Sequence, residues 1–273
     1  MITTVTLNAA IDKTYTVPGL TLGRPQRVQQ VLCRPGGKGI NVARVAAALG
    51  AEVVATGFIG GGAGRWIREE LTRLGLANEF VSVEGESRTT LALVDPVQGS
   101  LTELREPGPE ISPGEARLMV ETVRNLAGRS RVVVLSGSLP GGVPGNFYRE
   151  LVGVVKEAGA LALLDTSGPA LVQGLEAHPF MIKPNEEELR DLGNEPVPGV
   201  PEGADPVRAV QSARRWVERG ISLVVVSLGA AGLVAATRQG AWAVRPPSVA
   251  AVNTVGCGDA LVAGCTVVFD RHA

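Results

Sequence analysis

Histidine and cysteine are scarce in this sequence of 273 residues, which contains two histidines and three cysteines. His178 stands next to a proline and His272 lies in the terminal tail, so a histidine metal site and a Ser-His triad are nearly excluded. Cys33, Cys257 and Cys265 cannot all pair, and no CxxC spacing occurs. This cysteine usage is typical of a reducing compartment, and we expect a cytoplasmic protein.

Strong net charge and long apolar runs are also missing. The net charge of −1 predicts no general attraction to nucleic acid or to an anionic membrane surface. No apolar stretch approaches the roughly 20 residues that span a bilayer. The first residues, MITTVTLNAAID, lack the basic start and the long apolar run of a signal peptide. We therefore expect neither a nucleic-acid partner nor a membrane partner.

Several familiar motifs are absent as well. The sequence has no GxxxxGK[ST], which excludes a Walker P-loop, and no GxGxxG follows the first expected strand. The second absence argues against a nicotinamide oxidoreductase. Neither HExxH nor GxSxG occurs, so the common zinc protease and serine hydrolase patterns are missing too.

The residues that are present predict an α/β protein with one large core. Hydrophobic residues make up 45% of the chain, enough for a single domain over residues 1–273. Periodicity predicts strands at 2–8, 52–59, 131–135, 160–165, 180–183 and 222–229, a hairpin at 232–245, and helices at 38–49, 65–74, 112–127, 145–158, 168–175, from 185 onward and 206–219. The alternation from residue 131 onward predicts a mainly parallel sheet covered on both faces. Short β segments at about 13–34 and 79–104 interrupt it, and we expect them to form a small β-sheet lid.

Glycine-rich turns gather where such a fold binds ligands, at the carboxyl ends of the strands. The turn in NTVGCGDALVAG, residues 253–264, exposes backbone N–H groups at a helix start, which attract anions. Asp259 follows this turn directly. An ionised carboxylate would repel a bound anion, so its presence there indicates a different function. One such function is to accept the proton of a hydroxyl that attacks a phosphoryl group. Taken alone, the pattern is more often an ordinary helix start.

Two further motifs leave similar alternatives open. In PGGKGINVA, residues 35–43, the glycines allow a ligand near the backbone, while Lys38 suits a phosphate and Asn41 a sugar hydroxyl; a tight turn into a helix explains the residues equally well. In KPNEEEL, residues 183–189, Asn185 and Glu188 have the spacing of a capping box. The same two side chains could organise a hydrated Mg²⁺, although capping is the simpler explanation.

One stretch is locally basic. Six basic residues and no acidic ones lie between residues 13 and 51: Lys13, Arg24, Arg27, Arg34, Lys38 and Arg44. In a chain that is nearly neutral overall, this imbalance indicates either a basic pocket or a solvated face.

The ordered set of NAAID, PGGKGINVA, SGSLP, KPNEEEL and NTVGCGDALVAG resembles the PfkB (ribokinase-like) family of carbohydrate kinases, from residue 2 to about 269. The first and last long motifs resemble the two family signatures. With VSLGAAG, the set is similar to the branch that phosphorylates sugar phosphates, which contains 1-phosphofructokinase and tagatose-6-phosphate kinase. The resemblance implies a three-layer α/β/α sandwich with a mainly parallel sheet and a β lid.

The resemblance also implies an activity. We expect ATP-dependent phosphorylation of a ketose phosphate, foremost of fructose 1-phosphate to fructose 1,6-bisphosphate, with Mg²⁺. Tagatose 6-phosphate and fructose 6-phosphate are the alternative acceptors. An alternative of another class is a catalytically weak sugar-phosphate-binding protein. A homodimer through the lid is a further expectation.

Residue roles follow from the matching motifs. Asp259 matches the catalytic base, and Gly256, Cys257 and Gly258 match the anion hole. The acceptor side comprises Asp12, Gly36, Gly37, Lys38, Asn41, Arg88, Ser138 and, with less certainty, Arg27. The ATP side comprises Ser227, Gly229, Gly232, Asn185 and Gly258, with Glu188 and Asn185 acting on Mg²⁺ through water.

The chain departs from the family pattern at three points. Cys257 stands where Ala or Ser is usual, and its unchanged backbone N–H leads us to expect activity together with sensitivity to thiol reagents. Asn253 stands where many relatives carry Asp. Relatives carry further helices beyond the position of residue 273, and we expect their absence to weaken the adenine site.

Overall fold

The computed structural model describes residues 1–192, 205–247 and 255–272. Its main sheet has the strand order β14-β13-β12-β11-β10-β9-β1-β4-β5, with β6 also paired to β4. The strands are β1 (Ile2–Thr6), β4 (Val53–Gly60), β5 (Ala77–Asn78), β6 (Val81–Val83), β9 (Val132–Ser136), β10 (Leu161–Asp165), β11 (Met181–Ile182), β12 (Leu223–Ser227), β13 (Leu233–Thr237) and β14 (Gly240–Val244). The pairs are parallel except those of β13, which runs antiparallel to both neighbours.

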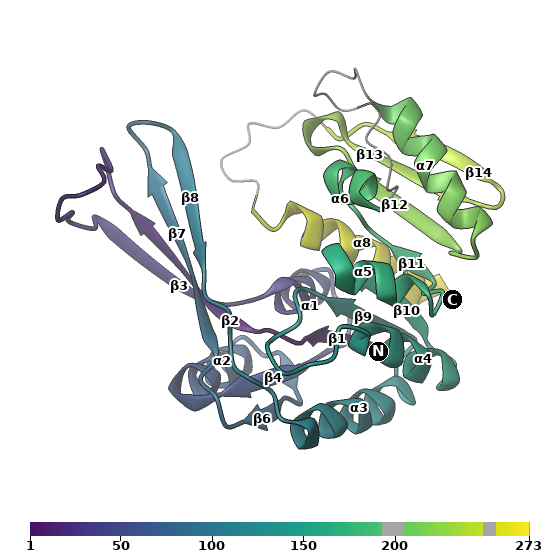
Figure 1. Cartoon of the computed structure of the whole chain (residues 1–273), viewed down its shortest axis with the longest axis horizontal. Coiled ribbons are helices and arrows are strands. Elements are labelled where there is room, and N and C mark those ends of the chain that lie inside the picture. The colour runs from purple at the N-terminus through teal and green to yellow at the C-terminus, as the bar shows by residue number, and fades with distance from the viewer. Residues whose placement is uncertain (193–204, 248–254, 273) are drawn as a thin grey trace.

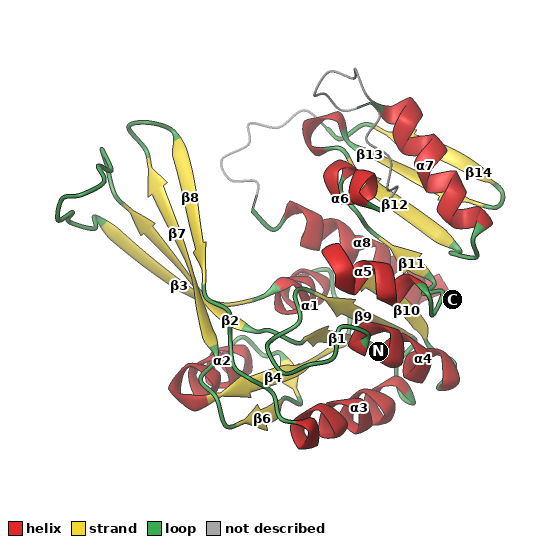
Figure 2. Cartoon of the chain, viewed as in Figure 1, coloured by secondary structure: helices red, strands yellow, loops and turns green. Residues whose placement is uncertain are grey.

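Helices cover both faces of this sheet (Figure 2). One face packs against α1 (Lys38–Ala48), α2 (Gly61–Arg73) and α8 (Cys257–His272). The other packs against α3 (Pro113–Ala127), α4 (Phe147–Glu157), α5 (Gly168–Leu175), α6 (Glu186–Asp191) and α7 (Pro206–Glu218). Central strands such as β9 are buried along their whole length, as expected when both faces are covered. The three-layer architecture predicted from the alternation is confirmed.

The local sequence determines where α3 begins, whereas a tertiary contact determines where α2 begins. Ser112 and Glu115 form the predicted capping box of α3. By contrast, α2 begins four residues before the predicted start, within a glycine run that disfavours helix. The Glu86 carboxylate accepts hydrogen bonds from the amides of Gly62 and Ala63, which stabilises this early first turn.

A four-stranded sheet projects from the body (Figure 1) and forms the lid. It has the order β3-β2-β7-β8 and consists of β2 (Ala10–Thr16), β3 (Gln30–Gly36), β7 (Arg88–Asp95) and β8 (Ser100–Arg105). The expected second range of the lid, 79–104, was wrong at its start. β6 instead pairs in parallel with β4 and buries Val81 and Val83 against the main core. Its alternating pattern fits any half-buried strand, so the pattern could not assign it to a sheet.

The described residues include no helix with the length and apolar character needed to cross a membrane.

The far end of the lid is held together by one buried carboxylate. Asp95 is 1% exposed and accepts hydrogen bonds from four backbone amides, those of Gly19, Leu20, Val97 and Gln98. Burial acts to raise the pKa of this carboxyl, but the four donors outweigh burial and lower it. The loop between β2 and β3 is thereby tied to the β7–β8 turn.

We predict that Asp95→Asn loosens this end of the lid while the body stays folded. The uncharged amide cannot accept four hydrogen bonds, so hydrogen exchange at residues 19, 20, 97 and 98 should become several-fold faster. In the native protein the protection should persist above about pH 4 and disappear as the pH falls through the lowered pKa. Hydrogen-exchange mass spectrometry measures both effects. Asp191→Asn, on exposed α6, is the control, and equal exchange in the two variants would contradict the assignment.

Candidate active site

The two glycine-rich motifs meet between α1 and α8, which lie side by side on one face of the sheet (Figure 1). Asn41, in the first turn of α1, donates a hydrogen bond from Nδ2 to Oδ2 of Asp259, in the first turn of α8, at 2.8 Å. Gly39 makes this close approach of α1 to the sheet feasible, since a Cβ there would lie 2.4 Å from the Thr6 hydroxyl oxygen. Residues separated by 218 positions are thus joined at one point.

Asp259 is a buried carboxyl with an altered affinity for protons. It is 7% exposed, and burial is the largest cause that raises its pKa, to about 6. The hydrogen bond from Asn41 and the charges of Lys38 and Lys183 act in the opposite direction, while the nearby Asp165 adds to the increase. A carboxyl with a pKa near 6 is ionised at neutral pH and still accepts a proton readily.

The backbone around Asp259 offers amide donors. Gly256 has a φ of 82°, which favours glycine, and the N–H groups of the first turn of α8 have no acceptor within the helix. Gly258 lies against Lys183, because a Cβ on this glycine would be 3.4 Å from the lysine Nζ. The Cys257 side chain is exposed, so its thiol leaves this cradle of amides open. Asn253 lies outside the described residues.

Asp165 holds two lysines beside the cradle. Its Oδ1 lies 3.2 Å from Nζ of Lys38 and 3.5 Å from Nζ of Lys183. Burial alone would lower the pKa of Lys38, but the charges of Asp165 and Glu188 and the hydrogen bond to Asp165 raise it. The sequence reasoning missed Asp165 and Lys183. The available signal was their position, since Asp165 is the last residue of β10 and Lys183 directly follows β11, at the edge where parallel strands end.

Asp12 lies on the lid side of the site. Its carboxyl occupies the space over Gly36, where a Cβ would be 2.1 Å from Cγ, and it accepts a hydrogen bond from the backbone of Gly37. Gly37 has a φ of 101°, so the pair of glycines is required here for both space and backbone conformation. Burial raises the pKa of Asp12, and the charge of Arg88 partly offsets this.

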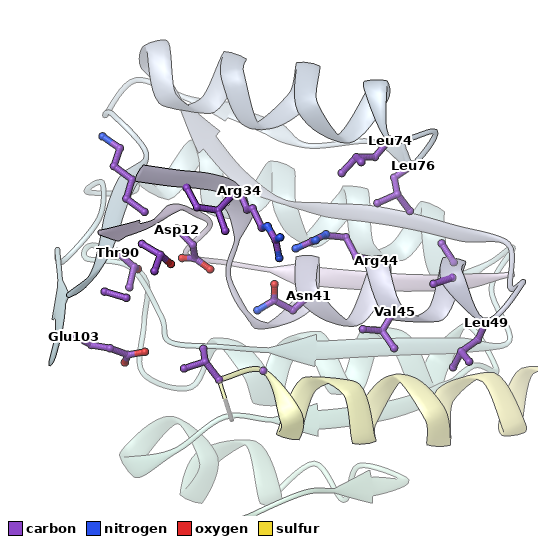
Figure 3. A pocket seen from close by; sticks show the side chains of 18 residues that line it. Asp12, Arg34, Asn41, Arg44, Val45, Leu49, Leu74, Leu76, Thr90 and Glu103 are labelled. Atoms are coloured by element: carbon purple, nitrogen blue, oxygen red, sulfur yellow. The ribbon is translucent and has the colours of Figure 1, made fainter. Parts of the chain in front are cut away.

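Asp12 and Asn41 line a single cavity of about 850 Å³ under the lid (Figure 3). Gly256 also lines it, so the cavity joins the predicted acceptor residues to the glycine turn that precedes Asp259. Arg34 and Arg44 lie in its wall as well, although neither was a predicted site residue. The volume suits a small phosphorylated sugar.

The other predicted acceptor residues do not line this cavity. Arg88 donates from Nε to the backbone oxygen of Asn8 at 3.2 Å, and the Ser138 hydroxyl accepts a hydrogen bond from Nδ2 of Asn8 at 3.3 Å. Lys38 is held by Asp165. Arg27 is exposed in the β2–β3 connection of the lid, so the structure does not bring it together with the others.

The predicted nucleotide residues come together at the ends of β11 and β12. Asn185 and Ser227 form an isolated parallel bridge, which brings KPNEEEL beside VSLGAAG. Gly229 and Gly232 have φ values of 56° and 101°, and a Cβ at Gly232 would lie 2.1 Å from the backbone oxygen of Val244. The turn between β12 and β13 therefore needs glycine at both positions.

Asn185 and Glu188 form the capping box that the spacing predicted. The Asn185 side chain accepts from the amide of Glu188 at 2.7 Å, and Oε2 of Glu188 accepts from the amide of Asn185 at 2.9 Å. The other carboxylate oxygen of Glu188 forms no hydrogen bond to a described residue, so it stays available to a hydrated cation. In the described part of the chain no three His, Cys, Asp or Glu side chains are grouped to hold a metal ion. This donor set fits Mg²⁺ bound mainly by waters and phosphates.

Comparison with known proteins now defines the class. A model of the pfkB family of carbohydrate kinases matches residues 5–273. Phosphofructokinase-2 from Escherichia coli in complex with fructose-6-phosphate is 28% identical, with a TM-score of 0.91, over 100% of this chain and 88% of that chain. Its tetrameric inhibited form is 30% identical, with a TM-score of 0.91 and the same coverage. A possible 1-phosphofructokinase from Thermotoga maritima is 31% identical, with a TM-score of 0.86, over 100% and 86%.

The fold is thus that of the ribokinase-like carbohydrate kinases, as the motifs predicted. The chain belongs to the pfkB family of carbohydrate kinases. It is a sugar-phosphate kinase, a phosphotransferase whose acceptor is an alcohol group.

The burial of Asp259 predicts a stability effect with a definite pH dependence. The carboxyl has a pKa near 3.9 in the unfolded chain and near 6 in the folded protein. The free energy of unfolding is therefore unaffected by this group below about pH 4, and it decreases as the pH rises through about 6. Asp259→Asn removes this loss. We expect the free energy of unfolding to increase by about 2 kcal/mol at pH 8 and by little at pH 4.

Urea denaturation at the two pH values measures the difference. Glu121→Gln, an exposed neutralising change on α3, serves as the control and should shift stability equally little at both. An Asp259→Asn effect of the same size at pH 4 and pH 8 would contradict the raised pKa.

Proposed function

We propose that the protein transfers the γ-phosphoryl group of ATP to a ketose phosphate, foremost fructose 1-phosphate, to form fructose 1,6-bisphosphate. The observation that carries the proposal is the buried Asp259, with a pKa of about 6, held by Asn41 beside a cavity of about 850 Å³. The similarity to a possible 1-phosphofructokinase and to phosphofructokinase-2 supports a fructose phosphate as acceptor.

Asp259 acts as the base in this proposal. Its ionised carboxylate accepts the proton of the acceptor hydroxyl as that oxygen attacks the γ-phosphorus. Asp12, Asn41 and the backbone at Gly36 and Gly37 hold sugar hydroxyls, because they line or adjoin the same cavity. Ser138 contributes a hydroxyl from the end of β9. The substrate is thereby oriented with one hydroxyl directed at Asp259.

The amide cradle stabilises the group in transfer. The N–H groups of Gly256, Cys257 and Gly258 face the charge that develops on the phosphoryl oxygens, and Lys183 adds a positive charge beside them. These donors are fixed by the backbone, so they need no reorganisation during the reaction. A side chain at residue 257 changes the chemistry little, since it is exposed.

The nucleotide lies along the other half of the site. Ser227, Gly229 and Gly232 form the turn that receives ATP, with Gly258 next to its phosphates. Asn185 and Glu188 would hold Mg²⁺ through water, and the ion, when bound, would supply positive charge against the phosphates.

Two alternatives stay open. The acceptor is tagatose 6-phosphate or fructose 6-phosphate if the phosphate is accepted at the other end of the sugar, since cationic side chains can hold a phosphate at either end of a small ketose. The protein is a catalytically weak sugar-phosphate-binding protein if the nucleotide half does not function.

We predict Mg-ATP-dependent turnover with fructose 1-phosphate that exceeds turnover with tagatose 6-phosphate, fructose 6-phosphate and fructose. Asp259→Asn should lower kcat by about 100-fold or more, because the proton acceptor is lost. In the native enzyme kcat/KM should fall as the pH drops through about 6, where Asp259 becomes protonated. Coupled measurement of ADP release tests these expectations, with Glu121→Gln as the control.

Preference for a 6-phosphate would change the acceptor and keep the mechanism. No turnover with any acceptor, together with binding of sugar phosphate, would favour the binding-protein alternative.

The lid offers a surface for a homodimer. Side chains alternate along its strands, so the face opposite Asp12 carries Tyr15, Val31, Leu91, Leu93 and Leu104. Val31 and Leu104 are 55% and 54% exposed, which is unusual for a lone β layer in water. We propose that two lids pack through this face; one of the related structures is tetrameric.

We predict a dimer in solution that Leu104→Lys converts to a monomer, because a charge would be buried in an apolar interface. Light scattering coupled to size exclusion gives the mass. Leu118→Lys, at an exposed position on α3, is the matched control. A monomeric native protein would rule out the proposed interface.

A further inference from the structure

Two arginines face each other across the cavity under the lid (Figure 3). Arg34 comes from β3 and Arg44 from α1, and both line the cavity of about 850 Å³ that also contains Asp12 and Asn41. Burial lowers the pKa of Arg44, and the positive charge of Arg34 lowers it further, while the negative charge of Asp12 acts in the opposite direction. Two cations brought together in this way repel one another in the free protein.

Neither guanidinium forms an ion pair within the described residues. Asp12, opposite Arg34 in the β2–β3 register, is the nearest carboxylate, and its negative charge acts on Arg44. Its carboxyl is turned to the Gly36–Gly37 backbone, however, and accepts a hydrogen bond there. Glu103, also in the cavity wall, is paired with Arg105. The cavity thus contains two neighbouring guanidinium groups that Asp12 offsets only in part.

The other cations of the region are less well placed. Lys13 also lines the cavity, but it follows Asp12 in β2, so its side chain leaves the opposite face of that strand. Lys38 is held by Asp165, and Arg88 donates to two backbone oxygens, those of Asn8 and Glu106. Neither lines the cavity. Arg27 is in the exposed β2–β3 connection. Of the candidates for holding a phosphate, the arginine pair is therefore the better placed.

The position of the pair along α1 fits the length of a sugar phosphate. Asn41 contacts Asp259, and Arg44 follows it by three residues on the same face of the helix, about 4.5 Å further along the axis. The Arg44 side chain turns back toward Arg34 and the N-terminal end of α1 (Figure 3), so the two guanidinium groups come together beside Asn41. A ketose with its reacting hydroxyl at Asp259 would direct its opposite end toward Arg34 and Arg44.

We propose that Arg34 and Arg44 bind the phosphate that the acceptor already carries and so select phosphorylated over free sugars. The proposal rests on the proposed function and identifies which residues recognise the acceptor. Two guanidinium groups provide several fixed donors for a phosphate dianion, and the dianion removes their mutual repulsion. A free sugar leaves the repulsion in place, so the pair favours phosphorylated acceptors.

The test compares Arg34→Gln, Arg44→Gln and the double variant with Arg88→Gln, the competing site. Arg117→Gln, exposed on α3, is the matched control. Each single variant of the pair should raise KM for fructose 1-phosphate about 10-fold to 100-fold, with kcat and KM for ATP changed less than threefold. The double variant should lose less than the product of the single losses, since the two groups share one phosphate. Arg44→Lys should recover part of the affinity.

A binding measurement separates this proposal from the kinase proposal. Titration calorimetry with fructose 1-phosphate, fructose 6-phosphate and fructose needs no turnover, so it is informative even if the native protein transfers no phosphate. Weaker binding of both phosphates in the pair variants, with fructose unchanged, supports the site. Removal of like-charge repulsion should leave the melting temperature of the free variants equal or higher.

Several results would overturn the proposal. Affinities within twofold of the native protein in both single variants would do so, as would a loss confined to Arg88→Gln. An equal loss for fructose and its phosphates would indicate a structural role instead. A native protein that binds neither sugar phosphate would exclude the site altogether, whereas turnover with unchanged KM in the variants would leave the kinase proposal standing.

Discussion

The burial of one carboxyl at the start of α8 is the constraint on which the site depends. Asp259 is 7% exposed and is satisfied by Asn41, so the two helices that carry them must lie side by side on the same face of the sheet. That arrangement needs small residues: Gly39 permits α1 to approach β1, and Gly256 supplies the turn into α8. An isolated charge at this depth would destabilise the fold. The hydrogen bond from Asn41 and two nearby lysines favour the ionised carboxylate, but burial outweighs them and raises its pKa to about 6. The same environment that weakens the fold at neutral pH prepares the carboxyl to accept a proton.

Positive charge is arranged differently on the two sides of this carboxyl. Beside the amide cradle, Lys38 and Lys183 are paired with Asp165, which orients them before any phosphate arrives. Under the lid, Arg34 and Arg44 face each other without an ion pair to a described residue, and the charge of Asp12 offsets their repulsion only in part. A paired cluster fixes the positions of its charges, although its burial carries a desolvation penalty, whereas two neighbouring cations repel one another until an anion binds. We infer that the first arrangement favours fixed geometry for phosphoryl transfer and the second favours selection of the acceptor.

Much of the architecture was predictable because local signals and burial agree. Largely apolar strands such as β9 and β10, and the capping box at Ser112, were recognised from single stretches of sequence and are confirmed. The motifs also indicated that PGGKGINVA and TVGCGD belong to one site. The hydrogen bond between Asn41 and Asp259 could not be predicted from them, because it depends on the tertiary structure. The assignment of residues 79–84 to the lid was wrong because alternation shows that one face is buried, not which sheet buries it. Arg34 and Arg44 were missed for a related reason. The sequence does not distinguish among the six basic residues of one stretch, and only the fold shows which of them line the same cavity.

The placement of the ionisable groups bears on how a doubly phosphorylated product would be tolerated. Under the proposed mechanism, Asp259 carries a negative charge before transfer and is neutral once it has accepted the proton. The product then bears one phosphate at the amide cradle and another at the arginine pair, with a neutral carboxyl between them. A base of ordinary pKa would remain ionised against the new phosphate and oppose its formation, while a pKa of about 6 makes the protonated form accessible near neutrality. Burial of Asp259 therefore has two effects in this mechanism. It raises the affinity of the carboxylate for the proton, and it favours the neutral carboxyl at the step when negative charge accumulates on the product.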